Sequence, residues 1–262
     1  MKQLTIASYG GGTNSTALLI ECANRGIPVD LILFADTGGE KPHTYNYVRI
    51  FSDWLVNHGL PEIITVKKVD LNGDVLTLED NCLNKKMLPS IAYGYKKCSQ
   101  KYKIQPQDKY VNNWNPAREL WKGGDKITKL IGYDADEPHR ADAEPSEDNK
   151  KKYDFRYPLI EWDMGRDDCI ATIERAGLCL PGKSACFYCP NSHPSEIRQL
   201  QAVYPHLAAR AVAMEQNADL TTLKGLGRRF AWGDLLATDD AFQDEYFHTP
   251  EMLCECYDGG DA

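Results

Sequence analysis

Short apolar runs alternate with amphipathic segments through the first half of the chain. Three nearly continuous apolar runs are typical of strands buried on both faces, and they cover residues 4–9, 29–34 and 63–69. Between them, residues 15–25 and 42–58 place apolar side chains at helical spacing, and Gly26 follows the first helix where a C-terminal glycine is expected. This order predicts two successive βαβ steps and therefore a parallel sheet.

The second half extends this pattern and then changes character. Further strands are predicted over 126–133 and 157–160, and the polar stretch 134–152 between them is predicted to be a mobile loop. From Gly165 onward helices and cysteines dominate, with helices expected over 167–176 and 194–216. We therefore expect an α/β protein with an open, parallel, five-stranded sheet and helices on both faces. Residues 1–164 form this domain, and residues 165–262 form a helical, cysteine-rich C-terminal region.

Composition and charge restrict the function classes. The chain has 262 residues, of which 42% are hydrophobic and 26% charged, and no apolar run approaches the roughly 20 residues of a membrane helix. No signal peptide is evident at the N-terminus, which favours a cytoplasmic location without membrane association. An odd count of nine cysteines then favours metal binding or thiol chemistry over a disulfide framework.

The formal net charge of -8 argues against a protein that covers nucleic acid with positive charge along its whole surface. Local basic segments are compatible with a basic groove, and solvated surface charge is the alternative. These segments contain Lys96, Lys97, Lys101 and Lys103, residues 150–152, and Arg228 and Arg229.

A glycine-rich loop between the first strand and the first helix is the strongest local signal. Its residues are Gly10, Gly11, Gly12, Thr13, Asn14, Ser15 and Thr16. A strand, glycines, small polar residues and a helix together aim backbone N–H groups and a helix N-terminus at a phosphate. The loop is neither G-x-G-x-x-G nor a Walker A sequence, and a plain glycine turn is the simpler alternative.

The loop resembles the S-G-G-x-D-S-T loop of the PP-loop ATP pyrophosphatases and of their relatives, the phosphoadenylylsulfate (PAPS) reductases. Gly11, Gly12, Ser15 and Thr16 match this pattern. Gly10 stands where the family usually has serine, and Asn14 where it usually has aspartate. An amide keeps the geometry and hydrogen bonding of that position but removes the charge that a metal would bind.

Two further segments resemble the same superfamily in the same order. Residues 34–40 are similar to its D-T-G-x-E segment, and residues 130–140 to its G-x-R-x-D-E-S-x-R segment. The resemblance implies a HUP-like, adenine nucleotide alpha hydrolase fold with the three segments around one crevice. It implies nucleotide contacts from the loop and from Asp36, Gly132, Asp136 and Glu137, and catalytic roles for Asn14, Ser15, Asp36 and Arg140. The alternatives are a capping role for Asp36 and a surface ion-pair cluster for Asp136, Glu137 and Arg140.

The cysteines suggest a metal centre. Cys186 and Cys189 form a C-x-x-C unit, which by itself is compatible with zinc, iron-sulfur or redox chemistry. Residues 97–106 resemble the C-C-x-x-[RK]-K-x-x-P segment of the assimilatory reductases, with Lys97 in place of the first cysteine. The resemblance implies a [4Fe-4S] cluster, and the ligands expected here are Cys98, Cys179, Cys186 and Cys189. Zinc and unligated thiols are the alternatives.

The remaining cysteines divide into two groups. Cys22, Cys82 and Cys169 lie in apolar or helical surroundings and are expected in the core. Cys254 and Cys256 form a C-E-C sequence that matches only the first two positions of the reductases' E-C-G-x-H tail, so a nucleophile and a frayed terminus are equal alternatives.

The leading functional hypothesis is an ATP pyrophosphatase that uses ATP and Mg²⁺ to adenylate its substrate for sulfur transfer, with tRNA or DNA as acceptor. A sulfur-donor protein and a homodimer are compatible with this reading. The alternatives are a PAPS or adenylyl sulfate reductase, and a non-catalytic, nucleotide-sensing, cluster-bearing subunit. Trp162, Trp232 and Tyr188 are candidates for stacking on bases, although core packing is the more frequent fate of such side chains.

Overall fold

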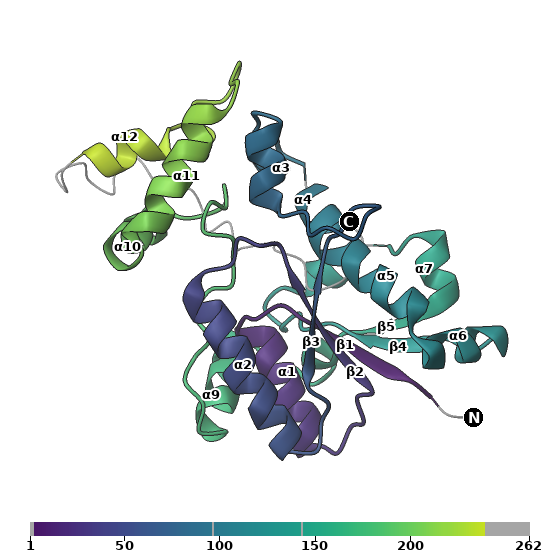
Figure 1. Ribbon diagram of the computed structural model, residues 1–262. Helices are drawn as coiled ribbons and strands as arrows, with labels where there is room; N and C mark the ends of the chain where they lie inside the picture. The colour runs from purple at the N-terminus through teal and green to yellow at the C-terminus, as the bar shows by residue number, and fades with distance from the viewer. Residues whose placement is uncertain (1–2, 96, 143, 239–262) are drawn as a thin grey trace.

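The computed structural model describes residues 3–95, 97–142 and 144–238, and its centre is a parallel five-stranded sheet (Figure 1). The strand order is β3-β2-β1-β4-β5, and every neighbouring pair is parallel. Ile6 lies opposite Leu31, and Thr5 lies opposite Thr128. The strands are β1 (Thr5–Tyr9), β2 (Leu31–Asp36), β3 (Ile63–Lys67), β4 (Ile127–Leu130) and β5 (Tyr153–Arg156). The predicted α/β fold class is thereby confirmed.

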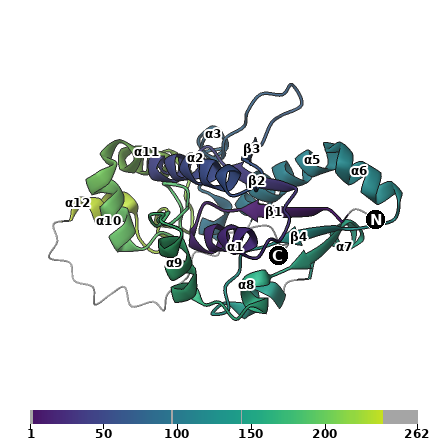
Figure 2. The same cartoon turned by 90° about the horizontal axis from the view of Figure 1, so that it is seen from below.

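Helices cover both faces of this sheet (Figures 1 and 2). One face carries α1 (Thr13–Asn24), α2 (Pro42–Asn57), α8 (Pro158–Glu161) and α9 (Arg166–Arg175). The other face carries α5 (Gln105–Asn113) and α6 (Asn115–Lys122), which follow a single π-helical turn, η2 (Gln100–Ile104). Two hydrophobic clusters fill these layers, with Leu18 and Phe51 in the first and Leu31 and Val111 in the second. The central strands are covered on both sides, so every residue of β1 and β2 is buried, without the alternation of a half-exposed strand.

A third hydrophobic cluster joins two distant parts of the sequence. It contains Cys82 and Tyr102 from the middle of the chain, and Phe187, Tyr188 and Trp232 from the C-terminal part. Its helices are α3 (Leu78–Asn84), η1 (Ser90–Tyr93), α4 (Lys97–Ser99), α10 (Pro194–Val203), α11 (Pro205–Asn217) and α12 (Trp232–Ala237). Helix α9 lies beyond residue 164 but packs against α1 in the sheet's own core.

Three sequence-based expectations were wrong in detail. The segment 157–160 is helical because Pro158 opens α8, and the fifth strand instead precedes it as β5. The helix expected over 194–216 is divided into α10 and α11, because Pro205 has no N–H to continue the first helix and starts a second. The stretch 134–152 contains η3 (Pro138–Asp142) and α7 (Glu147–Lys152) rather than loop alone.

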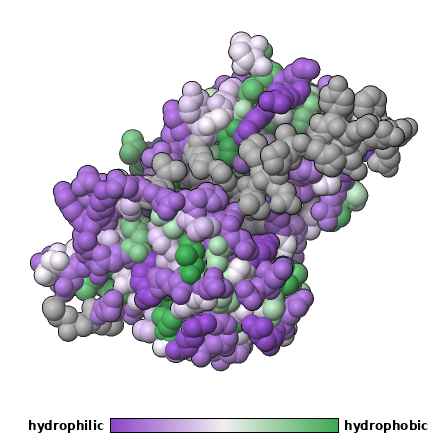
Figure 3. Space-filling model, turned by 180° about the vertical axis from the view of Figure 1, so that it is seen from behind, coloured by the Kyte–Doolittle hydropathy of each residue, from purple (hydrophilic) through white to green (hydrophobic). Residues whose placement is uncertain are grey.

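The surface seen from behind is mainly hydrophilic, with hydrophobic residues in scattered small groups (Figure 3). In the described part of the chain, no helix is long and apolar enough to cross a membrane.

A buried carboxylate connects α11 to the segment that leads into α12, and its removal should lower the stability of the fold. Glu215 is 6% exposed and accepts hydrogen bonds from the backbone N–H groups of Leu226 (2.6 Å), Trp232 (2.9 Å) and Gly233 (3.1 Å). Glu215→Ala leaves three donors without an acceptor and is expected to lower the free energy of unfolding by about 3 kcal/mol or more. Chemical denaturation measures this change. Glu215→Gln should lower the free energy of unfolding by less, and the control Glu174→Ala, at an exposed position, should change it little. Equal stability of Glu215→Ala and wild type would contradict this role of Glu215.

Candidate functional site

The glycine loop presents the start of α1 without a side-chain cap. Gly11 has a φ of +77°, which favours glycine, and a Cβ there would lie 3.2 Å from Thr44 Cγ2. Gly12 is the N-cap of α1 and has no side chain to bond the first N–H groups of the helix. The hydroxyls of Ser15 and Thr16 donate to the Gly12 carbonyl at 3.2 and 2.8 Å. The first turn is therefore held in place while its N–H groups are left for an external anion.

Asn14 fixes this first turn to two other parts of the chain. Its Nδ2 donates to Asp134 Oδ2 at 2.8 Å, and its Oδ1 accepts a hydrogen bond from Arg166 Nη1 at 2.8 Å. Asp134 follows β4, and Arg166 opens α9. We call these three residues the Asn14 network. Sequence reasoning selected Asn14, but Asp134 and Arg166 were not among the selected residues. Nothing local marks Arg166, since its partner lies 152 positions away.

The backbone after β4 makes a second close contact with the loop. A Cβ at Gly132 would lie 3.0 Å from both the N and the Cα of Ser15, closer than real Cβ atoms normally come. Gly132 therefore allows the end of β4 to lie directly on the start of α1. This contact sits at the point in the sheet order where the connections change direction, between β1 and β4. Open parallel sheets bind their ligands at such a point, beyond the carboxyl ends of the strands.

Asp134 is the buried charge of this contact. It is 3% exposed, and its Oδ1 has no hydrogen-bond partner among the described residues. Burial raises the pKa of Asp134, and the neighbouring Glu137 and Asp136 raise it further, against the lowering effect of the Asn14 hydrogen bond and of Arg166. One carboxylate oxygen is thus available for a donor or a cation in the crevice.

Asp36, at the carboxyl end of β2, is fully engaged with its surroundings. Its Oδ1 accepts hydrogen bonds from the Gly38 N–H (2.7 Å) and the Tyr45 hydroxyl (2.8 Å), and its Oδ2 lies 3.1 Å from Lys67 Nζ. Asp36 therefore caps the turn that follows β2, and its contact with a ribose or a metal stays a prediction.

Glu40 links the glycine loop to the C-x-x-C segment. Ser184 Oγ contacts both the Gly10 carbonyl (2.6 Å) and Glu40 Oε2 (3.2 Å), while Lys103 Nζ lies 3.6 Å from Glu40 Oε1. The backbone of Glu40 pairs with Cys186 in an antiparallel bridge. The residues after α9 therefore return to the edge of the crevice.

Asp136, Glu137 and Arg140 are engaged with one another and with α9. Asp136 Oδ2 accepts a hydrogen bond from the Arg166 backbone N–H at 2.6 Å, at the start of α9. Arg140 Nη1 lies 2.8 Å from Glu137 Oε2, and its guanidinium lies 4.2 Å from the centre of the Tyr133 ring. Their contact with phosphates stays a prediction.

The four predicted metal-binding cysteines come from different parts of the fold. Cys186 and Cys189 lie in one tight turn, in which the Cys189 N–H donates to the Cys186 carbonyl at 3.0 Å. Cys186 and Cys98 both border the third hydrophobic cluster, whereas Cys179 is exposed, in the segment that follows α9. In the described ranges, no three His, Cys, Asp or Glu side chains are placed to hold a metal ion. The ligand set Cys98, Cys179, Cys186 and Cys189 stays a prediction.

Cys186 is a half-buried thiol beside the third hydrophobic cluster. Burial raises its pKa well above the ordinary value, and Glu40 raises it further, while Lys103 acts in the opposite direction. The Thr37 hydroxyl lies 3.0 Å from its sulfur.

Several sequence-based expectations on buried residues are confirmed. Cys22, Cys82 and Cys169 are buried as expected, and burial raises the pKa of each to about 12. Tyr188 and Trp232 are fully buried in the third cluster, as expected of the more frequent, core-packing fate of such side chains, and they are not available to stack on bases. Cys254 and Cys256 lie outside the described residues.

Comparisons with known proteins add a structural likeness. No protein-family model matches the chain. No curated protein matches it either. Among solved structures, it is similar to the U34-tRNA thiolase NcsA from Methanococcus maripaludis with its [4Fe-4S] cluster. The two share 14% sequence identity over 91% of this chain and 83% of the thiolase chain, with a TM-score of 0.45.

The raised pKa of Asp134 predicts how stability depends on pH. A carboxyl whose pKa is higher in the folded than in the unfolded state destabilises the fold as pH rises above the unfolded value, about 3.9. Asp134→Asn does not titrate, so its unfolding free energy relative to wild type should increase from about pH 4 and level off above the folded pKa of Asp134. Urea denaturation between pH 4 and 7 measures this difference. A relative stability that falls with rising pH contradicts the assignment.

Proposed function

We propose that the protein is an ATP-binding enzyme that adenylates its substrate and releases pyrophosphate. The observation that carries this proposal is the uncapped start of α1. It lies between β1 and β4, where the connections of the sheet change direction, and the backbone at Gly132 packs directly against it. Backbone N–H groups of a helix start bind phosphate without a lysine, and the loop has none. The match of Gly11, Gly12, Ser15 and Thr16 to the PP-loop supports ATP as the ligand.

The residues present suit the departure of pyrophosphate. An acceptor oxygen attacks the α-phosphorus, the bond between the α-phosphorus and its bridging oxygen breaks, and pyrophosphate leaves with the bonding electrons. N–H groups already aimed at the β- and γ-phosphates stabilise the developing charge, since they need no reorganisation. Ser15 and Thr16 hold the loop in this geometry through the Gly12 carbonyl. Mg²⁺, when bound, would neutralise phosphate charge, and the available oxygen of Asp134 is the candidate ligand.

We further propose that the adenylated acceptor then receives sulfur and releases AMP, with a nucleic acid as acceptor. A sulfur nucleophile attacks the activated carbon, and the oxygen leaves with AMP. Cys186 lies next to the crevice through its backbone bridge with Glu40, and a separate sulfur donor would supply the attacking sulfur. A PAPS reductase would release sulfite rather than pyrophosphate, and a nucleotide sensor would release neither.

Nucleotide binding is tested by a single added methyl group. Gly132→Ala forces the end of β4 away from Ser15, which displaces the start of α1, and we expect the Kd for ATP to rise at least about tenfold. Isothermal titration calorimetry measures the affinity, and a coupled assay follows pyrophosphate release. Gly123→Ala, at the end of α6, is the control and should bind as wild type does. Unchanged affinity in a folded Gly132→Ala protein excludes ATP from this crevice.

Metal analysis tests the cysteine prediction separately. The ligand set Cys98, Cys179, Cys186 and Cys189 predicts a brown protein with about four irons per chain after anaerobic purification, and loss of this iron in Cys186→Ala. Tightly bound zinc at about one ion per chain would favour the alternative metal. A colourless protein without bound metal would contradict this ligand set and remove the cluster from the proposed function.

A further inference from the structure

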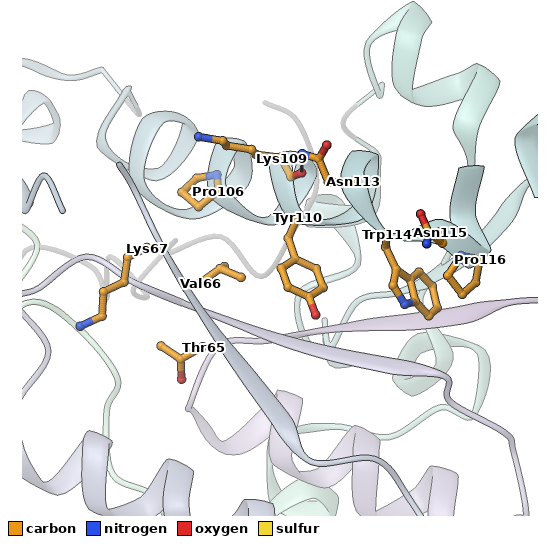
Figure 4. A pocket seen from close by; sticks show the side chains of 10 residues that line it. All are labelled: Thr65, Val66, Lys67, Pro106, Lys109, Tyr110, Asn113, Trp114, Asn115 and Pro116. Carbon is orange, nitrogen blue, oxygen red and sulfur yellow. Dashed lines mark hydrogen bonds between the residues drawn. The ribbon is translucent and has the colours of Figure 1, made fainter. Parts of the chain in front are cut away.

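A groove of about 720 Å³ runs along the edge strand β3, beside α5 and the start of α6 (Figure 4). Two aromatic side chains, Tyr110 and Trp114, extend from the helical side toward the strands, and Lys109 lies on α5 above them. Both rings are half-buried, with one part packed against the second hydrophobic cluster and the rest in the groove. The complete lining is Thr65, Val66, Lys67, Pro106, Lys109, Tyr110, Asn113, Trp114, Asn115 and Pro116. Among the residues that the structure describes, no Asp or Glu lines this groove. The groove is therefore basic and aromatic, although the chain has a net charge of -8.

Further lysines continue the groove beyond the carboxyl end of β3. Lys68 Nζ lies 4.8 Å from the centre of the Tyr102 ring, just before α5. Burial lowers the pKa of Lys68, and the nearby charges of Lys101 and Lys85 lower it further. The charges of Lys101 and Lys85 are thus close enough to Lys68 to repel it, and a bound anion would relieve this repulsion.

Most lysines in and near the groove have no carboxylate partner among the described residues. Within the described ranges, Lys68, Lys85, Lys101 and Lys109 form no ion pair with a carboxylate. Lys67 is paired with Asp36, at the carboxyl end of the neighbouring strand. The groove reaches the carboxyl end of β3, where Lys67 lines it and Lys68 follows in the chain. We call the groove together with Lys68, Lys85 and Lys101 the basic track.

We propose that the basic track binds a single-stranded segment of nucleic acid and directs it to the crevice. Phosphates lie along Lys109, Lys101, Lys68 and Lys85, and bases stack on Tyr110 and Trp114 in the groove. Stacking needs unpaired bases, because the faces of paired bases are covered by their neighbours in the duplex. The inference rests on the proposed function, for which it supplies the surface that holds the acceptor.

Binding of fluorescent 12-nucleotide single strands in the absence of ATP tests this proposal. Fluorescence anisotropy is measured with RNA, with DNA of the same sequence, and with a duplex, at 50 to 200 mM salt. About four lysine–phosphate contacts predict a slope of log K against log salt near −3 for the single strands. Lys101→Gln/Lys109→Gln should weaken binding about tenfold or more and reduce the slope by about 1.4.

A matched charge control separates the track from net charge. Lys122→Gln/Lys151→Gln removes two equally exposed lysines from α6 and α7 and should leave affinity near that of wild type. Trp114→Ala, checked by circular dichroism for folding, should weaken single-strand binding about five- to hundredfold with the salt slope unchanged.

The outcomes are distinct from those of the ATP experiments. Three results would overturn the proposed track. They are no binding of single strands by wild type at micromolar protein and 50 mM salt, equal losses of affinity in the track and control variants, and tighter binding of the duplex than of single strands. Lysine-dependent binding of single strands supports it, and the RNA and DNA arms then identify the acceptor type. Failure of ATP binding with intact single-strand binding removes the proposed function and leaves a nucleic-acid-binding surface.

Discussion

The contact between the start of α1 and the end of β4 is the constraint on which the candidate site depends. A glycine at position 132 lets two backbones meet, and the Asn14 network ties the same turn to the loop after β4 and to the start of α9. An amide at position 14 suits this role because it donates to Asp134 and accepts from Arg166 at once, whereas a carboxylate would oppose Asp134. The charge absent from position 14 lies instead on Asp134. The site is therefore held rigid by contacts that do not require the ligand.

The central sheet and its loop could be predicted from sequence because their signals are local. Buried strands in a parallel sheet are continuous apolar runs, and the glycine loop follows the first of them directly. Strand β5 was misplaced because it lies at the sheet edge and alternates buried Tyr153 with exposed Asp154, which gives a weaker signal than the apolar run after Tyr157. The break before Pro205 was missed because periodicity continues across it.

Long-range contacts account for the rest. The third hydrophobic cluster joins Tyr102 to Tyr188 and Trp232, and no local pattern indicates which of these distant aromatic residues are buried together. The aromatic residues that line a groove are Tyr110 and Trp114, which lie on α5 and at its end and face an edge strand only in the folded chain. The predicted cysteine set illustrates the same limit: Cys186 and Cys189 are close because they share a turn, whereas the position of Cys179 depends on how the chain leaves α9.

Hydrogen exchange at the glycine loop tests the central claim most directly. The account predicts that ATP with Mg²⁺ slows amide exchange in a peptide spanning residues 10–20, because the first N–H groups of α1 become bonded to phosphate. AMP, which lacks the β- and γ-phosphates, should protect this peptide much less, and a peptide from α6 should not respond to either nucleotide. Protection by ATP that spares residues 10–20 and appears elsewhere would contradict the account.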